Sequence, residues 1–277
     1  MKKGNIMKKK YADLLDEMFN IHLLEPKGAY CSMPATDLLN EGHMRKFIDQ
    51  YAPLIKALDD TATAAYLASW FFAMATGLQY MVSVQNKALD LSLTNVIIHM
   101  SPKSEGSYTR ISFQLRSWTE TEAPESDEKR QGWRKDVLSR LYGETLRPLL
   151  ECMSAVSGFN VGQMWGQLPT KFHYFIENLM EQTTNLEEKQ RVIDDYHFLQ
   201  HEFSPSVIGR SKNPFDVKVR FIEHIEDPTK QMRMKNVCCR YFRTEGAQYC
   251  YTCPLMKEED RAARRTKHRA EIIQANA

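Results

Sequence analysis

The sequence predicts an α+β fold: a mainly helical body, a small antiparallel sheet and a cysteine module near the C-terminus. Three observations carry this prediction. The stretch from Thr61 to Asn86 has no charged residue, apolar and polar residues alternate in short runs between residues 89 and 115, and four of the six cysteines lie between residues 238 and 253. Helical and strand patterns that are separated along the chain are typical of α+β proteins.

Length and charge limit the possible functions. The chain has 277 residues, which suits one large domain or two smaller ones. The net charge of +2 gives no reason to expect a nucleic-acid partner. The basic N-terminus is not followed by an apolar core of signal-peptide length, so we expect a cytoplasmic protein. In a reducing compartment, clustered cysteines favour a metal site over disulfides.

The uncharged stretch from Thr61 to Asn86 is long enough to cross a bilayer. It is diluted by alanine, threonine, serine and glutamine, and no basic cluster flanks it. A helix that is apolar all round is usually a core element. The stretch therefore predicts a buried central helix, and membrane association that is at most peripheral.

The first half of the chain alternates between the two periodicities. A helix is expected to start at Pro34–Asp37 and to be kinked at Pro53. After the uncharged helix, the runs at 89–98 and 111–115 predict an antiparallel hairpin, joined by a turn-rich segment at 101–107. The acidic stretch 119–129 is expected to be an exposed loop.

The second half of the chain predicts three helices and a late strand. The first helix is expected from about Trp133, with a bend at Pro148, to an end marked by Gly158 and Asn160. The other two are expected at about 161–182 and 186–203, and the strand at 217–221. A long connection at 204–214 precedes the strand. We therefore divide the chain into a helical α+β body, residues 1–215, and a C-terminal module, residues 216–277, which can pack together as one domain.

The cysteines of the module have the spacing C-C-x10-C-x2-C and are Cys238, Cys239, Cys250 and Cys253. Two residues between Cys250 and Cys253 let both thiolates converge on one metal centre. The adjacent pair is unusual for zinc, which commonly takes two separated knuckles. A [2Fe-2S] cluster is larger and takes four cysteines. The spacing favours iron–sulfur and leaves zinc, a disulfide or inert thiols as alternatives.

This segment resembles the signature of the FhuF-type siderophore ferric reductases, in which C-C-x10-C-x2-C binds a [2Fe-2S] cluster. Pro254 after the last cysteine also fits. A second similarity is Met164-Trp165-Gly166, which resembles the family's Leu-Trp-Gly-Asn region, with Gln167 where the family often has asparagine. The resemblance implies that the four cysteines bind the cluster and that the body presents a ferric siderophore.

The activity that the resemblance implies is reductive iron release. One electron converts Fe(III), which siderophores of the hydroxamate or citrate type bind tightly, into Fe(II), which the same oxygen donors bind weakly. The chain has no flavin or nicotinamide fingerprint, so we expect a separate electron donor such as a ferredoxin, a flavodoxin or a small reductant.

Basic residues flank the first cysteine pair without an acidic residue among them: Lys230, Arg233, Lys235, Arg240 and Arg243. They could form a positive rim that docks an anionic ferric chelate or an acidic electron donor, or they could be a solvated face. The candidate substrate contacts are Lys235, Arg240, Tyr241 and Trp165, and for Trp165 packing is the alternative. Cys31 and Cys152 are isolated and are expected in the core. A second function class stays open: a zinc-stabilised binding protein whose basic module contacts nucleic acid or a protein partner.

Overall fold

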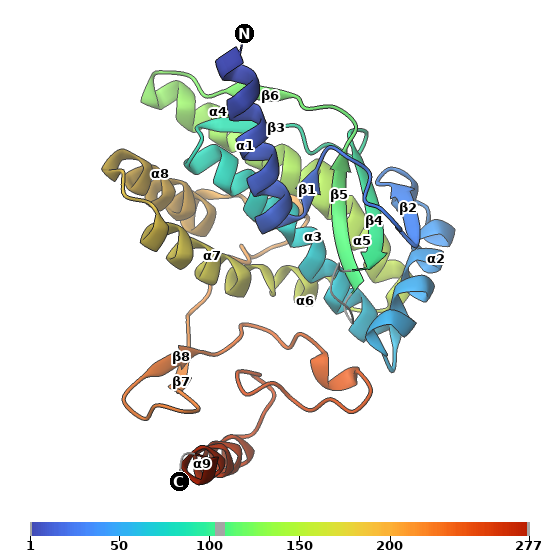
Figure 1. Ribbon diagram of the computed structural model, residues 1–277, viewed down its shortest axis with the longest axis vertical. Helices are drawn as coiled ribbons and strands as arrows, with labels where there is room; N and C mark the ends of the chain where they lie inside the picture. Colours follow the sequence, from blue (N-terminus) through green and yellow to red (C-terminus); the bar gives the residue numbers. More distant parts are fainter. Residues whose placement is uncertain (1, 103–108, 276–277) are drawn as a thin grey trace.

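The computed structural model describes residues 2–102 and 109–275, with side chains described from residue 11 onward. Figure 1 shows a mainly helical body that carries a small sheet, with the C-terminal segment on one side of it. The predicted α+β class is therefore confirmed. The helices of the described residues are α1 (Lys2–Phe19), α2 (Glu41–Tyr51), α3 (Asp60–Ser83), α4 (Asp127–Arg140), α5 (Arg147–Ser157), α6 (Val161–Trp165), α7 (Leu168–Gln182), α8 (Leu186–His197) and α9 (Glu258–Ala275).

The strands form three small sheets. The largest has the order β1-β5-β4-β2, and two hairpin-like pairs are β3–β6 and β7–β8. The strands are β1 (Ile21–His22), β2 (Cys31–Pro34), β3 (Lys87–Leu89), β4 (Val96–Pro102), β5 (Thr109–Leu115), β6 (Glu120–Glu122), β7 (Phe221–Glu223) and β8 (Gln231–Arg233).

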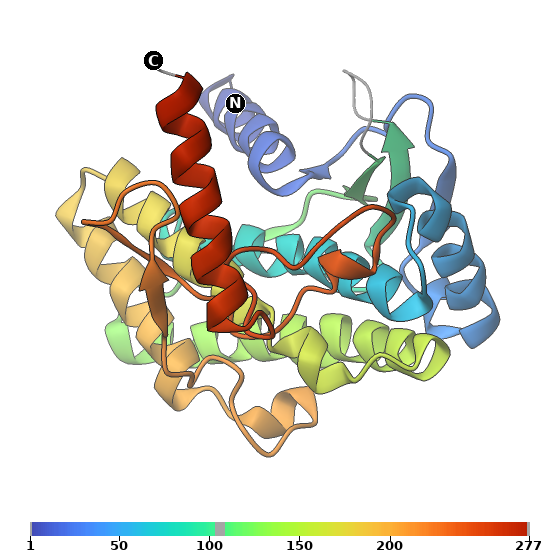
Figure 2. The same ribbon diagram turned by 90° about the horizontal axis from the view of Figure 1, so that it is seen from below.

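Helix α3 is the central element of the body. Asp59 caps its first turn by accepting a hydrogen bond from the Ala62 backbone N–H at 3.0 Å. Nearly all of its side chains from Ala62 to Ser83 are buried. Figure 2 shows the reason, since α3 lies between the sheet with α1 on one side and α5 on the other. The prediction of a buried central helix is confirmed, and no helix of the described residues has the length and apolar character that crossing a membrane requires.

The predicted hairpin is β4 paired with β5, in the register Ile98 opposite Phe113 and Met100 opposite Ile111. These four side chains are buried and face α3, whose Phe71 ring meets the Phe113 ring edge-on. The first strand of the hairpin begins at Val96 rather than at residue 89. Residues 87–89 instead form β3, which pairs with β6 inside the stretch expected to be a loop. Of the predicted turn at 101–107, residues 103–107 lie outside the described residues.

In the second half of the chain, the helices lie close to the predicted ranges but are interrupted at several points. The helix from residue 127 to residue 157 is interrupted by a π-helical segment, Leu141–Leu146, just before the proline that was expected to bend it. Gly158 ends α5 in a left-handed conformation with φ 68°. The expected helix at 161–182 is two helices, α6 and α7, separated at Gly166. The helix from Leu186 continues as a π-helical turn, Phe198–Glu202.

Three body helices are tied together by a buried carboxylate, Asp195 of α8. Its side chain is 0% exposed and accepts hydrogen bonds from Arg130 and Arg134 of α4 at 2.9 and 3.0 Å. Ser83 at the end of α3 donates to the same carboxylate at 2.8 Å. Because the charge is fully paired, this network fixes the positions of α3, α4 and α8 relative to one another.

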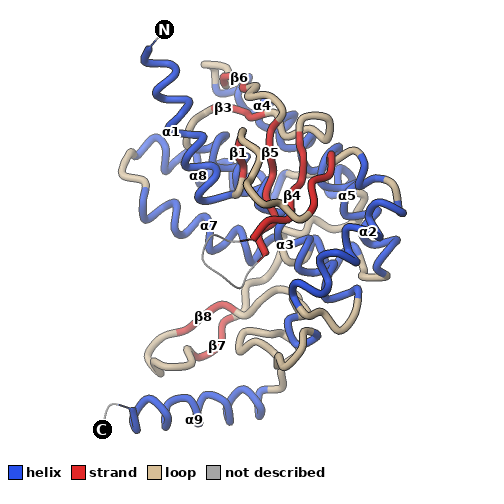
Figure 3. The backbone as a smooth tube through the Cα atoms, turned by 45° about the vertical axis from the view of Figure 1, so that its right-hand side comes forward, coloured by secondary structure: helices blue, strands red, loops and turns tan. Residues whose placement is uncertain are grey.

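Most of the C-terminal segment is loop, as Figure 3 shows between β8 and α9. It contacts the body through the turn before α3: Thr244 forms a β-bridge with Ala57, and the Leu58 backbone N–H donates to the Arg243 carbonyl at 2.9 Å. The expected strand at 217–221 is shifted, since β7 begins only at Phe221. The division of the chain at residue 215 stays a prediction.

Candidate metal centre

The four clustered cysteines lie on two loops that backbone hydrogen bonds hold side by side. The Lys235 N–H donates to the Thr252 carbonyl at 2.9 Å, which joins the loop before the first cysteine pair to the second knuckle. Within the knuckle, the Cys253 N–H donates to the Cys250 carbonyl at 2.9 Å and closes a tight turn. The distant parts of the motif thus converge.

The sulfur atoms are arranged as two close pairs. The Sγ atoms of Cys239 and Cys250 are 3.5 Å apart, and those of Cys238 and Cys253 are 3.6 Å apart. Two sulfurs bound tetrahedrally to one metal at about 2.3 Å lie about 3.7 Å apart. Each pair therefore matches the spacing of two ligands on one metal, and a [2Fe-2S] cluster takes two thiolates per iron. In the part of the chain that the structure describes, no group of three or more His, Cys, Asp or Glu side chains is arranged around a single metal position.

The two pairs differ in exposure. Cys253 and Cys238 are buried, at 0% and 6% exposed, whereas Cys239 and Cys250 are partly exposed. Burial raises the pKa of Cys238 to about 11. Hydrogen bonding with Cys250, followed by the charge of Lys235, lowers the pKa of Cys239 to about 5. The same hydrogen bond, together with burial, raises the pKa of Cys250, so within this pair the thiolate charge resides on Cys239.

Lys235 is the cation that serves this pair. Its Nζ donates to the Sγ of Cys239 at 3.2 Å and to that of Cys250 at 3.4 Å. Burial alone would lower the pKa of Lys235, but the two sulfurs outweigh burial and raise it. The structure therefore supports Lys235 as a site residue and gives it a contact with two cluster ligands.

A pocket of about 390 Å³ opens beside the same two sulfurs. Helix α3 supplies one wall through Ala65, Tyr66 and Ser69, and Gln167 lies at the start of α7. The module supplies the opposite wall, where Lys235 and Tyr241 accompany the sulfurs of Cys239 and Cys250. The pocket is thus shared between the body and the module, and of the two sulfur pairs only the Cys239–Cys250 pair lines it.

Gly166 is the point at which the module packs on the break between α6 and α7. A Cβ atom there would lie 2.6 Å from Val237, directly before the first cysteine. Asn236 donates from its side chain to the Gly166 carbonyl at 3.0 Å and from its backbone to Thr170 at 3.1 Å. The Met-Trp-Gly stretch therefore includes a close helix–loop contact that only glycine permits.

Trp165, a candidate substrate contact, lies in the core. Its side chain is 1% exposed, and its ring packs against Phe72 and Tyr142 at centroid distances of 5.7 and 6.2 Å. The ring has no open face from which to contact a chelate in this arrangement. The packing interpretation is the one that the structure supports.

Arg240 also points away from the pocket. Its guanidinium donates to Gln163 at 3.2 Å and lies over the Phe159 ring, 5.4 Å from the centroid. Its backbone, in a left-handed conformation with φ 60°, directs its N–H to the Cys238 Sγ at 3.4 Å. Arg240 therefore joins the module to the body and supports a buried sulfur, and its side chain is not among those that line the pocket.

Three of the other flanking basic residues form ion pairs with carboxylates that do not line the pocket, and the role of these residues as a docking rim stays a prediction. Arg243 pairs with Asp59 at the start of α3, and Arg233 pairs with Glu177 of α7. Lys230 pairs with Asp227 within its own loop. Of the five flanking residues, Lys235 is the one that lines the pocket.

A second buried cation supports the knuckle from α9. Arg261 is 2% exposed and donates to the carbonyls of Tyr251 and Cys253 at 3.0 and 2.8 Å. Tyr251 is buried and donates its hydroxyl to the Glu223 carbonyl at 2.7 Å. It belongs to the scaffold of the knuckle.

Sequence reasoning missed the body wall of the pocket. Tyr66 and Ser69 come from the uncharged stretch, where i, i+3 spacing places both on one helix face. Because the same helix carries further threonine, serine and glutamine residues, this spacing alone did not single out the pair. Burial, followed by the nearby Cys239 charge, raises the pKa of Tyr66 to about 12, so its hydroxyl is a hydrogen-bond donor near neutral pH.

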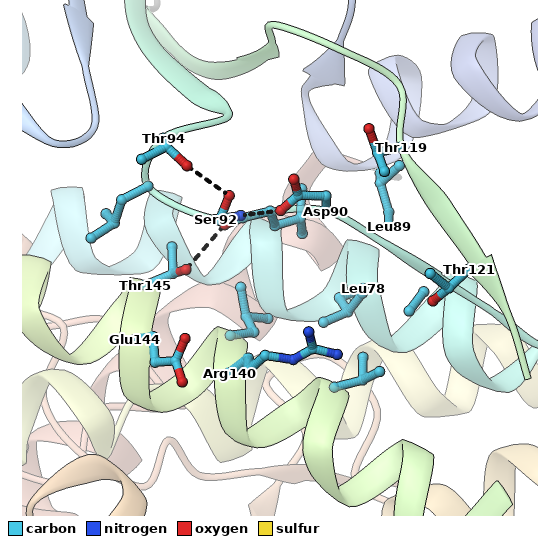
Figure 4. Close-up of a pocket in the computed structure, with 15 residues that line it drawn as sticks. Leu78, Leu89, Asp90, Ser92, Thr94, Thr119, Thr121, Arg140, Glu144 and Thr145 are labelled. Carbon is cyan, nitrogen blue, oxygen red and sulfur yellow. Dashed lines mark hydrogen bonds between the residues drawn. The ribbon is translucent and has the colours of Figure 1, made fainter.

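A larger cavity of about 550 Å³ was not predicted either (Figure 4). It lies between the end of α3, the loop that begins at Asp90 and the α4–π junction, where Thr145 donates to the Leu91 carbonyl at 3.1 Å. Arg140 and Glu144 line its exposed edge. This cavity and the pocket beside the cysteines are lined by different parts of α3. Leu78 of this cavity and Ala65 of the other pocket are roughly 20 Å apart along the helix, at a rise of 1.5 Å per residue. None of the four cysteines lines this cavity.

Comparison with known proteins supports the interpretation of the module. The family model described as the FhuF 2Fe-2S C-terminal domain matches residues 236–255, which include all four cysteines and the two loops that bring them together. No curated protein matches the chain significantly. The match, the four-thiolate donor set and the two sulfur pairs agree with one another, and they favour the iron–sulfur interpretation over zinc. Residues 236–255 therefore match a FhuF-type 2Fe-2S C-terminal domain, and this match indicates a [2Fe-2S] cluster as the cofactor of the segment.

Proposed function

We propose that the protein is a cytoplasmic ferric-siderophore reductase, which delivers one electron to chelated Fe(III) and so releases Fe(II). In this proposal Cys239 and Cys250 hold one iron of the cluster, and Cys238 and Cys253 hold the other. The observation that carries the proposal is the pocket on the Cys239–Cys250 side: within a 2Fe-2S domain, one sulfur pair is buried and the other lines an open cavity.

The cluster, when bound, supplies a one-electron store at a potential that exposure, charge and hydrogen bonds to sulfur adjust. Residues of the chain adjust the charge at the sulfurs and donate hydrogen bonds to the chelate. Lys235 directs two N–H groups at the pocket-facing sulfurs, which favours added negative charge there. Tyr66 and Tyr241 place phenol groups on opposite walls, where they can donate hydrogen bonds to chelate oxygens.

Reduction by one electron is sufficient for release. Siderophores hold Fe(III) through hard, charged oxygen donors, and the same donors hold the larger and less charged Fe(II) much more weakly. A protein that reduces the metal need not break a covalent bond of the chelator. This explains how an electron-transfer pocket without a nucleophile or general base at recognised spacing can be sufficient for function.

The electron donor is a separate partner in this proposal, such as a ferredoxin, a flavodoxin or a small reductant. The sequence contains no fingerprint for a nucleotide cofactor that would carry hydride. The acceptor is a ferric siderophore of the hydroxamate or citrate type.

The first test measures the cofactor and the activity on the same sample. Protein purified without oxygen should be red-brown, with about two irons and two sulfides per chain, and should bleach with dithionite. After removal of dithionite, the reduced protein is mixed with ferric hydroxamate or ferric citrate chelates, and Fe(II) is trapped with a coloured ferrous chelator. We expect close to one Fe(II) per cluster, with reoxidation of the visible spectrum at the same rate.

Two cysteine variants provide a matched comparison. Cys250→Ser removes a pocket-facing ligand and should change the spectrum and abolish Fe(II) production. Cys152→Ser removes an isolated, partly buried thiol of α5 and should leave the visible spectrum and Fe(II) production unchanged. A colourless protein with one zinc per chain, or a reduced protein that keeps its electron in the presence of every ferric chelate, would refute the proposed function.

A further inference from the structure

We propose that the pocket beside Cys239 and Cys250 selects a compact anionic ferric chelate, with Lys235 and Lys171 as the residues that set this preference. The inference rests on the proposed function and narrows its substrate from ferric siderophores in general to those that are negatively charged around the metal. It follows from the charges, donors and size of one cavity.

The donor groups of the pocket match an oxygen-rich anion. The lining side chains contain an ammonium, two phenols, a hydroxyl and an amide, and no carboxylate. Asp59, directly before α3, pairs with Arg243, and Glu245 pairs with Lys56. The lining residues therefore offer hydrogen-bond donors to a ligand and no negative charge of their own beyond the sulfurs.

Lys235 reduces the electrostatic repulsion that an anionic ligand would meet at the cluster. Four thiolates around two ferric ions and two sulfides carry a net charge of −2, which repels an approaching anion. Lys235 lies against both pocket-facing sulfurs at 3.2 and 3.4 Å and lines the pocket itself. An ammonium has three N–H groups and two are directed at sulfur, so one remains for the ligand.

Lys171 is a second cation next to the wall of the pocket, although it is not itself among the lining residues. Its Nζ donates to the carbonyl of Ser69, a residue that lines the pocket, at 2.8 Å. It has no carboxylate partner among the described residues. Burial lowers the pKa of Lys171 to about 8, so the side chain is still mainly charged near pH 7. One cation in the cavity and a second beside its wall offset the cluster charge and favour an anion.

The volume of the cavity limits the size of the chelate that can bind. A volume of about 390 Å³ is at the low end of the range of about 300–1,000 Å³ for small-molecule sites. It suits a compact chelate, such as a carboxylate or hydroxycarboxylate complex, or the metal-bearing end of a larger one. A bulky neutral complex would gain neither the ion pairs nor a close fit.

The test uses chelates of Ga(III), which has the charge and nearly the size of Fe(III) but is not reduced here. Binding of gallium citrate, which is anionic, and of a neutral gallium trihydroxamate is measured by isothermal titration calorimetry on the oxidised holoprotein. We expect the anionic chelate to bind at least tenfold more tightly at low ionic strength. This advantage should shrink in 0.5 M salt.

Four variants test which residues cause the preference for the anionic chelate. Lys235→Gln and Lys171→Gln should each weaken gallium citrate binding about five- to tenfold and leave the neutral chelate unchanged; Lys171→Gln touches no cluster ligand. Lys267→Gln removes the same charge from an exposed position on α9 and should leave the affinity for both chelates unchanged. Ser69→Trp fills the pocket without changing charge and should abolish binding of both chelates. The visible spectrum confirms that each variant keeps its cluster.

Equal binding of both chelates, or a gallium citrate affinity that neither lysine variant nor Ser69→Trp changes, would overturn the inference. These outcomes are separate from failure of the proposed function. Ferric chelates can still be reduced when selectivity is absent, and selective gallium binding without any ferric reduction would support the pocket while refuting the reductase.

Discussion

Replacing Lys235 by methionine should lower the reduction potential of the cluster. The ammonium lies 3.2 and 3.4 Å from two ligand sulfurs, so it stabilises the reduced form, which carries one more negative charge, more than the oxidised form. Methionine has a similar length but neither the charge nor the N–H donors. The change therefore removes the interaction while filling most of the same space.

The expected magnitude follows from these distances. Two unit charges 4 Å apart at an effective dielectric constant of 20 interact by about 4 kcal/mol. The added electron is spread over the cluster and Lys235 is partly exposed to solvent, so we take roughly a quarter to a half of this value, about 1–2 kcal/mol. Since about 59 mV corresponds to a tenfold change for one electron, the potential should fall by roughly 40–90 mV.

The assay is a spectroelectrochemical titration of the visible bands, with the signal of the reduced cluster in electron paramagnetic resonance as a second readout. Lys235→Arg keeps the charge and should recover most of the potential. Lys267→Met, on exposed α9, should shift it by less than about 10 mV because solvent screens that charge. A potential that rises, or that stays within 10 mV of the unchanged protein in Lys235→Met, would refute this role for Lys235.

Three other changes test the scaffold. Gly166→Ala forces a Cβ to 2.6 Å from a valine of the module, so it should lower the free energy of unfolding by about 1–3 kcal/mol and speed cluster loss in chelator challenge. Gly132→Ala, where a Cβ meets nothing within 4 Å, should do neither. Asp195→Asn leaves two buried arginines without their carboxylate and should destabilise the protein by about 3–5 kcal/mol in urea titrations, whereas a loss below 1 kcal/mol would contradict the buried network. Burial lowers the pKa of His22 and of His99, so below about pH 6.5 the unfolded chain takes up protons that the folded protein does not. Stability should therefore fall from pH 7.5 to 5.5, and replacing both histidines by glutamine should flatten that fall.

The fold was predictable where the periodicity was strong. The uncharged stretch could be interpreted as a buried helix because a long run without charge has no solvent-facing side, and α3 confirms it. The alternation around Phe113 likewise identified the hairpin. Short strands such as β6 were missed, because its three residues, Glu120 to Glu122, are polar and its pairing with β3 is a tertiary contact. The break at Gly166 was missed for the same reason, since the valine that packs on it lies about 70 residues later in the sequence.

The metal centre was predictable because its ligands are local in sequence. The four cysteines lie within one short segment, so their spacing favoured an iron–sulfur centre, and the resemblance to the FhuF-type signature pointed to a [2Fe-2S] cluster. The candidate substrate contacts are not local in the sequence, and their role in binding a substrate stays a prediction. Lys235 and Tyr241 line the pocket, whereas Arg240 and Trp165 are used in packing. Charge in a sequence does not show which cations are already paired, and only the fold places acidic partners opposite them.

The composite pocket argues that the body and the module act as one redox unit. The sulfurs of Cys239 and Cys250 come from the module, but Tyr66 and Ser69 on the opposite wall come from the central helix of the body. The module alone could bind a cluster, but it would present those sulfurs to solvent without selectivity. The contacts that close the pocket are the bridge at Thr244 and the packing at Gly166. Any change that loosens them should therefore reduce substrate selection before it affects cluster binding, because the ligands lie in the module and the second wall of the pocket does not.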